Sequence, residues 1–584
     1  MNHSSRPFLD RPLRLALGLA ALCLLLTAGG AHALPAKIAL IHFNPVLGDD
    51  DANLPPLNAL VRQALEHGAN IVVTPELATT GFSITRAQVV ADLGFTYPYP
   101  ELNTIRNLAI AHHAYVFVGI AEVTPEGGVY NTIVVFGPAG YLTKQQKRGL
   151  SGWHDRGIVP FQVIPTVYGD LGTMVCSDVY LPDWLRILTL KGADIALLPA
   201  NWWGRSGQEE IWQTRARENG VWFLTANRWG REVDERFGFP FVYEMNDAPS
   251  AAISPDGEIR LIHRAEDDPV PANKILYKTV DVPVVRIGNA LNPVYTVGFR
   301  EPQAYPAIAN LYYRPDLGNQ PAPGLPPEGI TRLASMAYTP TLFPAANLAT
   351  IEQTWAQSGA EADVLVLPGV GLSPVPVNAS NPGWSAAWPW SALQDFVEDE
   401  GLQLLVTSVL EQRGFGVRES LLALRPGQPP VLARQIHDSL LGSGSGTPPL
   451  LLDLPHARIG LVLGRDALFP EISTHLAKSG ADAFVIPSRA GAPATSPSDF
   501  APHYFWTPAA LLRAWKTQTN HVVHLAASDW TGNGVVIENT FGVIGRLETV
   551  GSGQVRVLDV DSAAVRTKFL NAYYPFDLSV LLSN

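Results

Sequence analysis

Apolar residues along the first half of the chain fall into two alternating patterns. Short continuous apolar runs, typical of buried strands, occur at 37–41, 71–75, 116–119, 132–136, 172–175 and 195–198. Between some of these runs apolar residues recur every three or four positions, which predicts helices over 57–67, 181–191 and 208–219. Strands that alternate with helices in this way predict an α/β layered domain.

The same arrangement occurs a second time further along the chain. Gly172, Cys176, Asp178, Pro182, Asp194 and Pro199 are followed, each at an offset of 288, by Gly460, Gly464, Asp466, Pro470, Asp482 and Pro487. So many matches at one offset indicate a duplication, with two domains built on one plan. A stretch with seven prolines between residues 302 and 327 separates the copies and is typical of a linker.

The N-terminus has the pattern of a secretory signal peptide. Arg6, Arg11 and Arg14 precede an uncharged run over 15–31, and small residues surround a cleavage point near Ala33. The alternative is a permanent anchor, for which the run is short. We therefore expect a leader over 1–33, domains over 34–300 and 330–584 with a linker over 301–329, and a secreted or periplasmic protein without a membrane span.

Composition limits what such a protein can be. With 584 residues, 47% hydrophobic and 16% charged, the chain is too long for one core and too apolar for disorder or a coiled coil. Its net charge of -12 counts against a nucleic-acid partner. Removal of the leader, with Cys23, leaves Cys176 as the one cysteine, which excludes an intrachain disulfide and directs attention to a catalytic role.

Three residues stand where open α/β folds place reacting groups, just after strands or hairpins. Glu76 follows the apolar run 71–75, Lys147 follows the hairpin-like segment 131–141, and Cys176 ends the run 172–175. Taken singly, such a carboxylate or lysine is more often solvated, and such a cysteine is more often core. Together they have the chemistry of a nucleophile, its base and a stabilising cation.

The surrounding motifs carry a family resemblance. Pro75-Glu76 with Gly81-Phe82, Lys147, Cys176-x-Asp178-x-x-x-Pro182, Pro199-x-Asn201-Trp202 and 215–219 resemble the nitrilase (carbon–nitrogen hydrolase) superfamily. The resemblance covers about 37–285 and, in degenerate form, 330–560. It implies an α/β fold with two αββα-sandwich domains in tandem, paired as an intramolecular pseudo-dimer.

The resemblance also implies roles for individual residues. Glu76 would be the general base, Lys147 the stabiliser of the oxyanion and thiolate, and Cys176 the nucleophile, with the backbone N–H of Ser177 as an oxyanion donor. We expect burial to raise the pKa of Glu76 toward neutrality. Tyr180, Asn201 and Trp202 are candidate substrate-binding residues. No metal or other cofactor is expected.

One feature of the family pattern is missing. Many members carry a further glutamate between the lysine and the cysteine, whereas this chain has only His154 and Asp155 in the stretch 148–157. We expect Asp155 to serve as the auxiliary acid, with a surface turn as the alternative.

The second copy lacks all three reacting groups. Gly369, Gln435 and Gly464 stand where the first copy has Glu76, Lys147 and Cys176. We therefore expect an inert domain that pairs with the first, a plan that resembles secreted vanin/biotinidase-type amidases.

These observations favour an exported thiol hydrolase that cleaves a small-molecule amide through a thioester. The sequence Cys176-Ser177-Asp178 favours amides over nitriles. Nitrile hydrolysis, acyl transfer to an amine, and a secreted binding protein on two inactive domains are the alternatives. The sequence leaves further homo-oligomerisation open.

Overall fold

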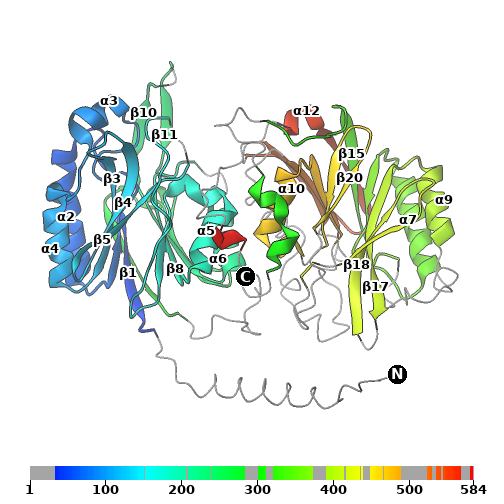
Figure 1. Ribbon diagram of the computed structural model, residues 1–584, viewed down its shortest axis with the longest axis horizontal. Coiled ribbons are helices and arrows are strands. Elements are labelled where there is room, and N and C mark those ends of the chain that lie inside the picture. Colours follow the sequence, from blue (N-terminus) through cyan, green and yellow to red (C-terminus); the bar gives the residue numbers. More distant parts are fainter. Residues whose placement is uncertain are drawn as a thin grey trace, which may run out of the picture.

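The computed structural model describes residues 33–149, 152–204, 208–236, 238–282, 300–310, 320–372, 390–413, 416–434, 436–437, 448–463, 466–487, 523–528, 534–540, 543–566 and 579–582. The predicted leader up to residue 32, linker residues 311–319, and positions 435 and 464 lie outside these residues. The described chain forms two α/β halves that lie side by side (Figure 1).

The first half contains two six-stranded sheets. One has the order β14-β1-β2-β3-β4-β5 and the other the order β13-β12-β9-β8-β7-β6. The strands of the first sheet are β1 (Ala36–His42), β2 (Ile71–Val73), β3 (Tyr115–Val123), β4 (Val129–Gly137), β5 (Gly140–Gln146) and β14 (Lys274–Val280). Those of the second are β6 (Val163–Ile164), β7 (Leu171–Thr173), β8 (Ile195–Ala200), β9 (Trp222–Asn227), β12 (Ser250–Ile253) and β13 (Ile259–His263).

Helices cover the outer faces of both sheets. They are α2 (Asp50–Glu66) and α4 (Asn103–Ala111) on the first sheet, and α5 (Pro182–Leu190) and α6 (Gln208–Asn219) on the second. The alternation of side chains along a strand produces these layers: Ile38 and Leu40 of β1 pack between the sheets, whereas Ala39 and Ile41 pack toward the helices. The first half is therefore an α–β–β–α sandwich.

The central strands of each sheet run parallel, so their carboxyl ends share an edge. β2 pairs in parallel with β1 and β3, and β8 pairs in parallel with β7 and β9. Glu76 follows β2 and Cys176 follows β7, which brings both to that edge. A two-stranded ribbon, β10 (Arg231–Asp234) and β11 (Phe241–Glu244), projects above the sandwich there (Figure 1).

Predicted and observed elements agree in kind and differ at their ends. The helix over 208–219 has the predicted bounds. The helix predicted over 57–67 begins earlier, at Asp50, because the side chain of Asp49 accepts a hydrogen bond from the N–H of Ala52 at 2.9 Å and caps it. The strand predicted over 71–75 ends at Val73, and the loop that carries Glu76 follows it.

The second half has the same order of strands. Its sheets run β19-β18-β17-β16-β15-β26 and β20-β21-β22-β23-β24-β25. The first comprises β15 (Ile330–Ala337), β16 (Val364–Val366), β17 (Leu404–Arg413), β18 (Gly416–Leu424), β19 (Val431–Arg434) and β26 (Gln554–Asp561). The second comprises β20 (Leu450–Asp453), β21 (Arg458–Leu461), β22 (Ala483–Pro487), β23 (Val523–Ser528), β24 (Gly534–Thr540) and β25 (Val543–Val550).

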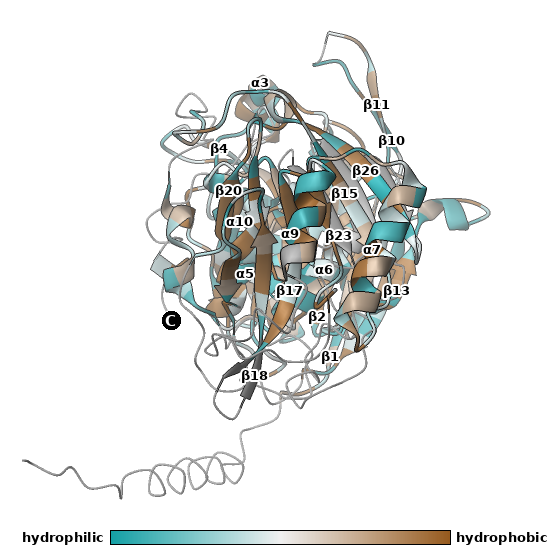
Figure 2. Ribbon diagram, turned by 90° about the vertical axis from the view of Figure 1, so that its right-hand side faces the viewer, coloured by the Kyte–Doolittle hydropathy of each residue, from teal (hydrophilic) through white to brown (hydrophobic). Residues whose placement is uncertain are grey.

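Its helices are α7 (Pro344–Ser358), α9 (Trp390–Asp399), α10 (Pro470–Lys478) and the short α12 (Ser562–Val565). Figure 2 shows apolar residues concentrated in the strands, while α7 and α9 alternate between apolar and polar positions, as expected of helices that cover a sheet. Among the described residues, no helix combines the length and the apolarity needed to cross a bilayer.

The two halves meet through equivalent helices. α5 of the first half contacts α10 of the second. Ile187 and Leu188 of α5 belong to the same buried apolar cluster as Ile472 and Leu476 of α10. The hydrophobic core is therefore continuous across the contact between the halves.

Candidate active site

The loop after β2, which carries Glu76, packs against the backbone of the neighbouring strand β3. Leu77, which follows it, has a φ of 50°, a left-handed conformation that is strained for a residue with a Cβ. The loop lies so close to β3 that a Cβ on Gly119 would stand 2.2 Å from the carbonyl oxygen of Pro75. Glycine at position 119 is thus what lets the loop pack down and hold Glu76 in place.

The carboxylate of Glu76 is buried and fully engaged. Its Oε1 accepts hydrogen bonds from Lys147 Nζ and from Asn131 Nδ2, both at 2.7 Å. Its Oε2 accepts the backbone N–H of Asn201 at 3.0 Å, and the side-chain amide of Asn201 holds the Glu76 carbonyl oxygen at 2.9 Å. The thiol of Cys176 is close enough for the charge of this carboxylate to act on it. The three predicted reacting groups therefore meet at one point.

Electrostatic interactions determine the resting protonation of Glu76 and Lys147. Burial alone would raise the pKa of Glu76, but the Lys147 ammonium and the hydrogen bonds from Lys147 and Asn131 outweigh it and place the pKa below the ordinary value. The expectation that burial raises the pKa of Glu76 toward neutrality is therefore wrong, because the ammonium is in direct contact. Burial would lower the pKa of Lys147, yet the charge of Glu76 raises it.

Cys176 begins a tight turn, Cys176–Tyr180, between β7 and α5. Its own φ is 46°, again in the left-handed region. Burial, followed by the charge of Glu76, raises the pKa of the Cys176 thiol well above its ordinary range, against the opposing effect of Lys147. The resting state is therefore a protonated thiol beside an ionised carboxylate.

Asp178 joins the turn to the strand end that carries Lys147. Its carboxylate accepts the backbone N–H groups of Arg148 and Gly149, at 3.1 and 2.9 Å from Oδ1, and that of Val175 at 3.2 Å from Oδ2. Burial raises the pKa of Asp178 to about 6, although the Lys147 charge and these N–H groups oppose the shift. Asp178 thus fixes the separation between Lys147 and the turn Cys176–Tyr180, which we call the nucleophile turn.

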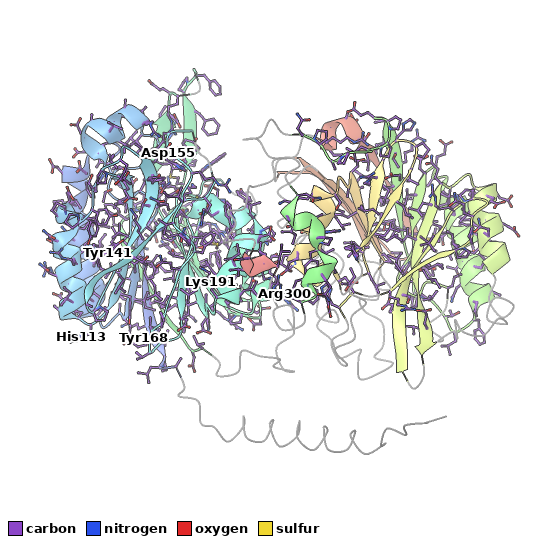
Figure 3. All side chains as sticks on the ribbon, viewed as in Figure 1. His113, Tyr141, Asp155, Tyr168, Lys191 and Arg300 are labelled. Carbon is purple, nitrogen blue, oxygen red and sulfur yellow. The ribbon has the colours of Figure 1, made fainter. Side chains whose placement is uncertain are left out.

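The structure does not bring Asp155 into this cluster. Its carboxylate pairs with Arg86 at 2.9 Å, both side chains are more than two-fifths exposed, and the Arg86 guanidinium lowers its pKa. Figure 3 places it at the upper edge of the first half, near β10 and β11. The prediction of Asp155 as an auxiliary acid is therefore corrected to the alternative, a surface ion pair that closes a turn.

The neighbouring His154 is the buried member of that segment. Its Nδ1 lies 2.9 Å from the carbonyl oxygen of Asp155, which can only accept, so the proton sits on Nδ1. Burial and the charge of Lys147 lower the pKa of His154 to about 4. It is therefore neutral near pH 7.

The four remaining candidate residues have different surroundings. Ser177 and Tyr180 are half-buried in the nucleophile turn, and burial together with the nearby Cys176 raises the pKa of Tyr180 to about 12. Trp202 is buried, with its ring 5.1 Å from that of Tyr180 and 5.7 Å from that of Trp212. Asn201, predicted to bind substrate, donates hydrogen bonds to Glu76 from both its backbone N–H and its side-chain amide. Tyr180 and Ser177 are thus the members that lie beside the nucleophile.

Sequence reasoning missed Asn131 and the positioning role of Asn201. Asn131 lies on β4, whose nine residues are all buried, so a polar side chain in that apolar strand was the available signal. A buried amide needs partners, and here its partner is the carboxylate of Glu76, the candidate base. The role of Asn201 has no such signal, because its contact with Glu76 spans 125 positions.

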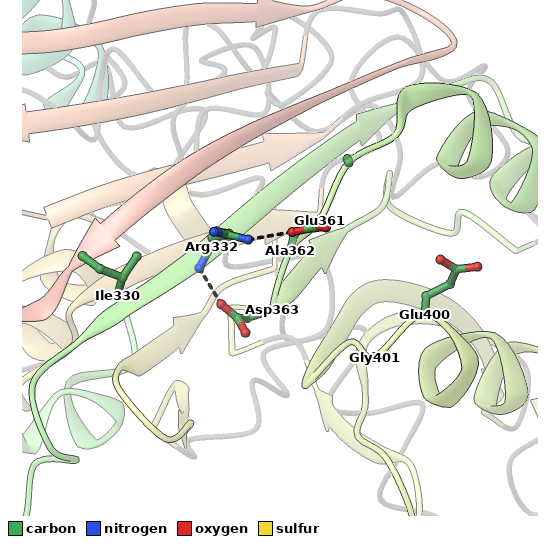
Figure 4. Close-up of a pocket in the computed structure, with 8 residues that line it drawn as sticks. Ile330, Arg332, Glu361, Ala362, Asp363, Glu400 and Gly401 are labelled. Atoms are coloured by element: carbon green, nitrogen blue, oxygen red, sulfur yellow. Dashed lines mark hydrogen bonds and ion pairs between the residues drawn. The ribbon is translucent and has the colours of Figure 1, made fainter.

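A pocket of about 430 Å³ lies elsewhere, in the second half (Figure 4). It opens at the amino ends of β16 and β17 and contains Arg332, which pairs with Glu361 at 3.1 Å. Ligand sites of open α/β sheets lie at the opposite, carboxyl edge. Within the described residues, no group of three or more His, Cys, Asp or Glu side chains could hold a metal ion.

A layered α/β domain that buries a thiol against a carboxylate–ammonium pair has the parts of a thiol hydrolase. The family model for carbon-nitrogen hydrolases matches residues 37–285. A nitrilase from Pyrococcus abyssi is 32% identical over 207 residues, which cover 34% of this chain and 78% of that protein. The chain belongs to the carbon–nitrogen hydrolase (nitrilase) superfamily and is a carbon–nitrogen hydrolase.

Other relatives have amidase names or known structures. A 2-oxoglutaramate amidase of Bacillus subtilis is 22% identical over 215 residues, covering 34% of this chain and 79% of its own. Among solved structures, Saccharomyces cerevisiae Nit3, a member of branch 10 of the nitrilase superfamily, is 20% identical with a TM-score of 0.38, covering 44% of this chain and 93% of that one. An amidase from Nesterenkonia is 22% identical with a TM-score of 0.35, covering 43% and 92%.

Proposed function

We propose that this protein is a thiol amidase in which Glu76, Lys147 and Cys176 act as base, oxyanion stabiliser and nucleophile on a small carbon–nitrogen substrate. The observation that carries the proposal is the buried carboxylate of Glu76, which binds the Lys147 ammonium at 2.7 Å and acts electrostatically on the Cys176 thiol. A base must lie close to the proton that it removes, and Glu76 is the carboxylate placed to do so.

The steps follow from the resting protonation. As the sulfur of Cys176 attacks the carbonyl carbon, its proton passes to Glu76, and the oxygen gains negative charge beside the Lys147 ammonium and the N–H of Ser177. Collapse breaks the C–N bond, and Glu76 returns the proton to the leaving amine. Water then attacks the thioester, with Glu76 as base, and releases the acid and the thiol.

Amides are the proposed substrates, and nitriles and acyl transfer remain the second candidates. The relatives include proteins named as nitrilases and as amidases, so the names alone do not choose. The nucleophile sequence Cys176-Ser177-Asp178 favours amides. Acyl transfer would require an amine to intercept the same thioester.

We further propose that the second half is a degenerate copy of the catalytic domain. Asp466 accepts the N–H groups of Ile436 and His437, both at 3.0 Å, at positions 288 beyond those of the Asp178 contacts with Arg148 and Gly149. Val370, after the Gly369 that replaces the base, has a φ of 50°, as Leu77 has. The supporting frame is retained where the reacting groups are lost.

Crossed contacts support an intramolecular pseudo-dimer. Arg186 contacts Glu471, and Thr474 donates to Asp183 at 3.0 Å. Glu471 is equivalent to Asp183, and Thr474 is equivalent to Arg186, at the offset of 288. The two contacts therefore join the same pair of equivalent positions, once in each direction across the interface. Such reciprocal pairing is the mark of a two-fold interface.

The whole-chain plan extends the proposal. A secretory leader, a catalytic domain and an inert partner domain resemble vanin/biotinidase-type amidases, which favours export to a secreted or periplasmic location. Export is tested by sequencing the N-terminus of the mature protein, which we expect to begin near residue 34. An uncleaved N-terminus in the exported fraction would contradict it.

Turnover of a panel of short acyl amides, carbamoyl compounds and pantetheine-like amides tests the chemistry. We expect amine release by the native chain and none by Cys176→Ala or Glu76→Gln. Trapping with an added amine separates the candidates, because hydrolysis yields free acid and acyl transfer yields a new amide. Full activity of Cys176→Ala would end the proposal.

A further inference from the structure

We propose that Glu471, which belongs to the second half, is a positioning residue for the turn that carries Cys176. The inert half would then complete the geometry of the catalytic half as well as pack against it. This inference rests on the proposed function of Cys176 and adds to it a residue from outside the catalytic domain.

Glu471 lies in the first turn of α10 and is fully buried at the contact with α5. Its Oε1 lies 2.5 Å from Arg300 Nε and 3.3 Å from Arg186 Nε, and the side chain of Arg186 is itself fully buried. Burial alone would raise the pKa of Glu471, but the two guanidinium groups hold it below the ordinary value. One carboxylate therefore contacts two buried cations, Arg186 of α5 across the interface and Arg300, which also donates to the carbonyl oxygen of Leu581.

Arg186 passes the contact on to α6. Its Nη2 donates to the backbone carbonyl oxygen of Glu218 at 3.1 Å, in the last turn of that helix. The carboxylate of the same Glu218 pairs with Arg215 Nη1 at 2.8 Å. The orientation of Arg186 thus bears on the end of α6 that holds Arg215.

Arg215 closes the chain of contacts on the nucleophile turn. Its Nε donates to the carbonyl oxygen of Val179 and its Nη2 to that of Tyr180, both at 2.8 Å. These carbonyls end the turn Cys176–Tyr180, whose first residue is held at a φ of 46°. A strained backbone persists only where its surroundings over-determine it, and these hydrogen bonds are part of that restraint.

The consequence concerns proton transfer from Cys176 to Glu76. That transfer needs the thiol within hydrogen-bond reach of the carboxylate. Without the Glu471 carboxylate, Arg186 and Arg300 face each other across a neutral side chain and must separate, which releases the end of α6 and the turn. The thiol then titrates as a free group instead of reacting through Glu76.

The test is the pH profile of Cys176 alkylation by iodoacetamide in the full-length chain, followed by mass spectrometry of the Cys176 peptide. The native chain keeps reacting at about pH 6, because Glu76 accepts the proton. In Glu471→Gln we expect the rate to fall about tenfold for each pH unit below the pKa of a free thiol, since the thiolate is the nucleophile.

Asp482→Asn is the matched control. Asp482 is also a fully buried carboxylate of the second half, and it binds Arg566 Nη2 at 2.9 Å and the N–H of Arg458 at 2.9 Å, away from the α5 contact. We expect it to lower the unfolding midpoint as Glu471→Gln does and to leave the alkylation profile native. A native profile for folded Glu471→Gln, or the same altered profile for both variants, would overturn the inference.

Glu471→Asp keeps the test decisive if Glu471→Gln does not fold. It retains the charge but withdraws the carboxylate from Arg186, so we expect the same change of profile at smaller size. A native profile for this variant counts against the inference. Glu76→Gln separates this inference from the proposed function. If the alkylation profile of Glu76→Gln is native, Glu76 is not the base and the proposed function fails. If the profile of Glu76→Gln is altered but that of Glu471→Gln is native, only the inference about Glu471 fails.

Discussion

At the scale of single residues, the proposed chemistry depends on the carboxylate of Glu76 and the groups that surround it. The sequence predicted Glu76, Lys147 and Cys176 because each follows a strand or hairpin whose end could be recognised. It predicted the wrong direction for the pKa of this carboxylate, because that pKa depends on how closely Lys147 approaches through space. It also placed the auxiliary role on Asp155, since spacing along the chain does not reveal that Arg86 captures this side chain at the surface.

Asn131→Leu tests how the carboxylate is kept ionised. Removing the hydrogen bond at 2.7 Å takes a donor from a charged acceptor, a contact worth about 1.5–3 kcal/mol. The pKa of Glu76 should therefore rise. Because the proposed base must be ionised, the acid limb of kcat/KM should move to higher pH. An unshifted limb would show that Lys147 alone sets the pKa.

His475→Gln tests a buried group remote from the site. Burial lowers the pKa of His475 to about 4, against a backbone hydrogen bond with Tyr305 that raises it. The N–H of Ala307 donates to Nδ1 at 3.2 Å and favours the neutral ring. The pKa of His475 is thus lower in the folded chain than in the unfolded chain, so between pH 6.5 and 4 the unfolded chain binds the proton more strongly. Stability that is present above pH 6.5 is therefore lost as the pH falls toward 4. The native chain should lose up to about 1.4 kcal/mol per pH unit more than the variant in that window. Equal slopes in chemical denaturation would contradict this.

At the scale of elements, the loops after the strands are fixed by side chains from distant segments. Glu232, on β10, accepts the N–H groups of Phe82 and Ser83 at 3.1 and 2.9 Å and pairs with the buried Arg228. It also leaves no room at Gly81, where a Cβ would stand 2.6 Å from its Oε1. Strand and helix periodicity predicted the elements well, because it is local. It could not predict this anchorage, which joins positions about 150 apart.

Glu232→Ala should therefore be costly. It leaves the Arg228 guanidinium buried without its carboxylate, and removing one partner of a buried pair costs about 3–5 kcal/mol. The exposed pair of Arg260 and Asp256, at 2.9 Å with both side chains nearly half exposed, is the control. Asp256→Ala should cost about 1 kcal/mol or less. Urea denaturation of both variants provides the comparison, and similar losses would show that the ribbon does not anchor the loop.

At the scale of the whole molecule, the offset of 288 connects sequence and structure. It predicted the matched carboxylates Asp178 and Asp466. In the structure both accept hydrogen bonds from backbone N–H groups at equivalent positions. The sequence predicted that the two halves pair, but not which side chains meet, because the halves contribute different side chains at equivalent positions. Where the first half has Asp183, the second has Glu471, which reaches Arg186 across the contact.

That asymmetry makes a prediction about the first half alone. A fragment of residues 34–300 exposes α5, with Ile187, Leu188 and the otherwise buried Arg186. The residue equivalent to Glu471 is Asp183, so a second copy of the fragment offers Arg186 a carboxylate of the right sign on the right face. We expect the fragment to dimerise through α5, and Arg186→Asp to weaken the dimer by placing like charges together. Sedimentation velocity over a concentration series measures this, with the full chain as reference. A fragment that is folded and monomeric throughout would show that α5 recognises features of the second half that the first half does not share.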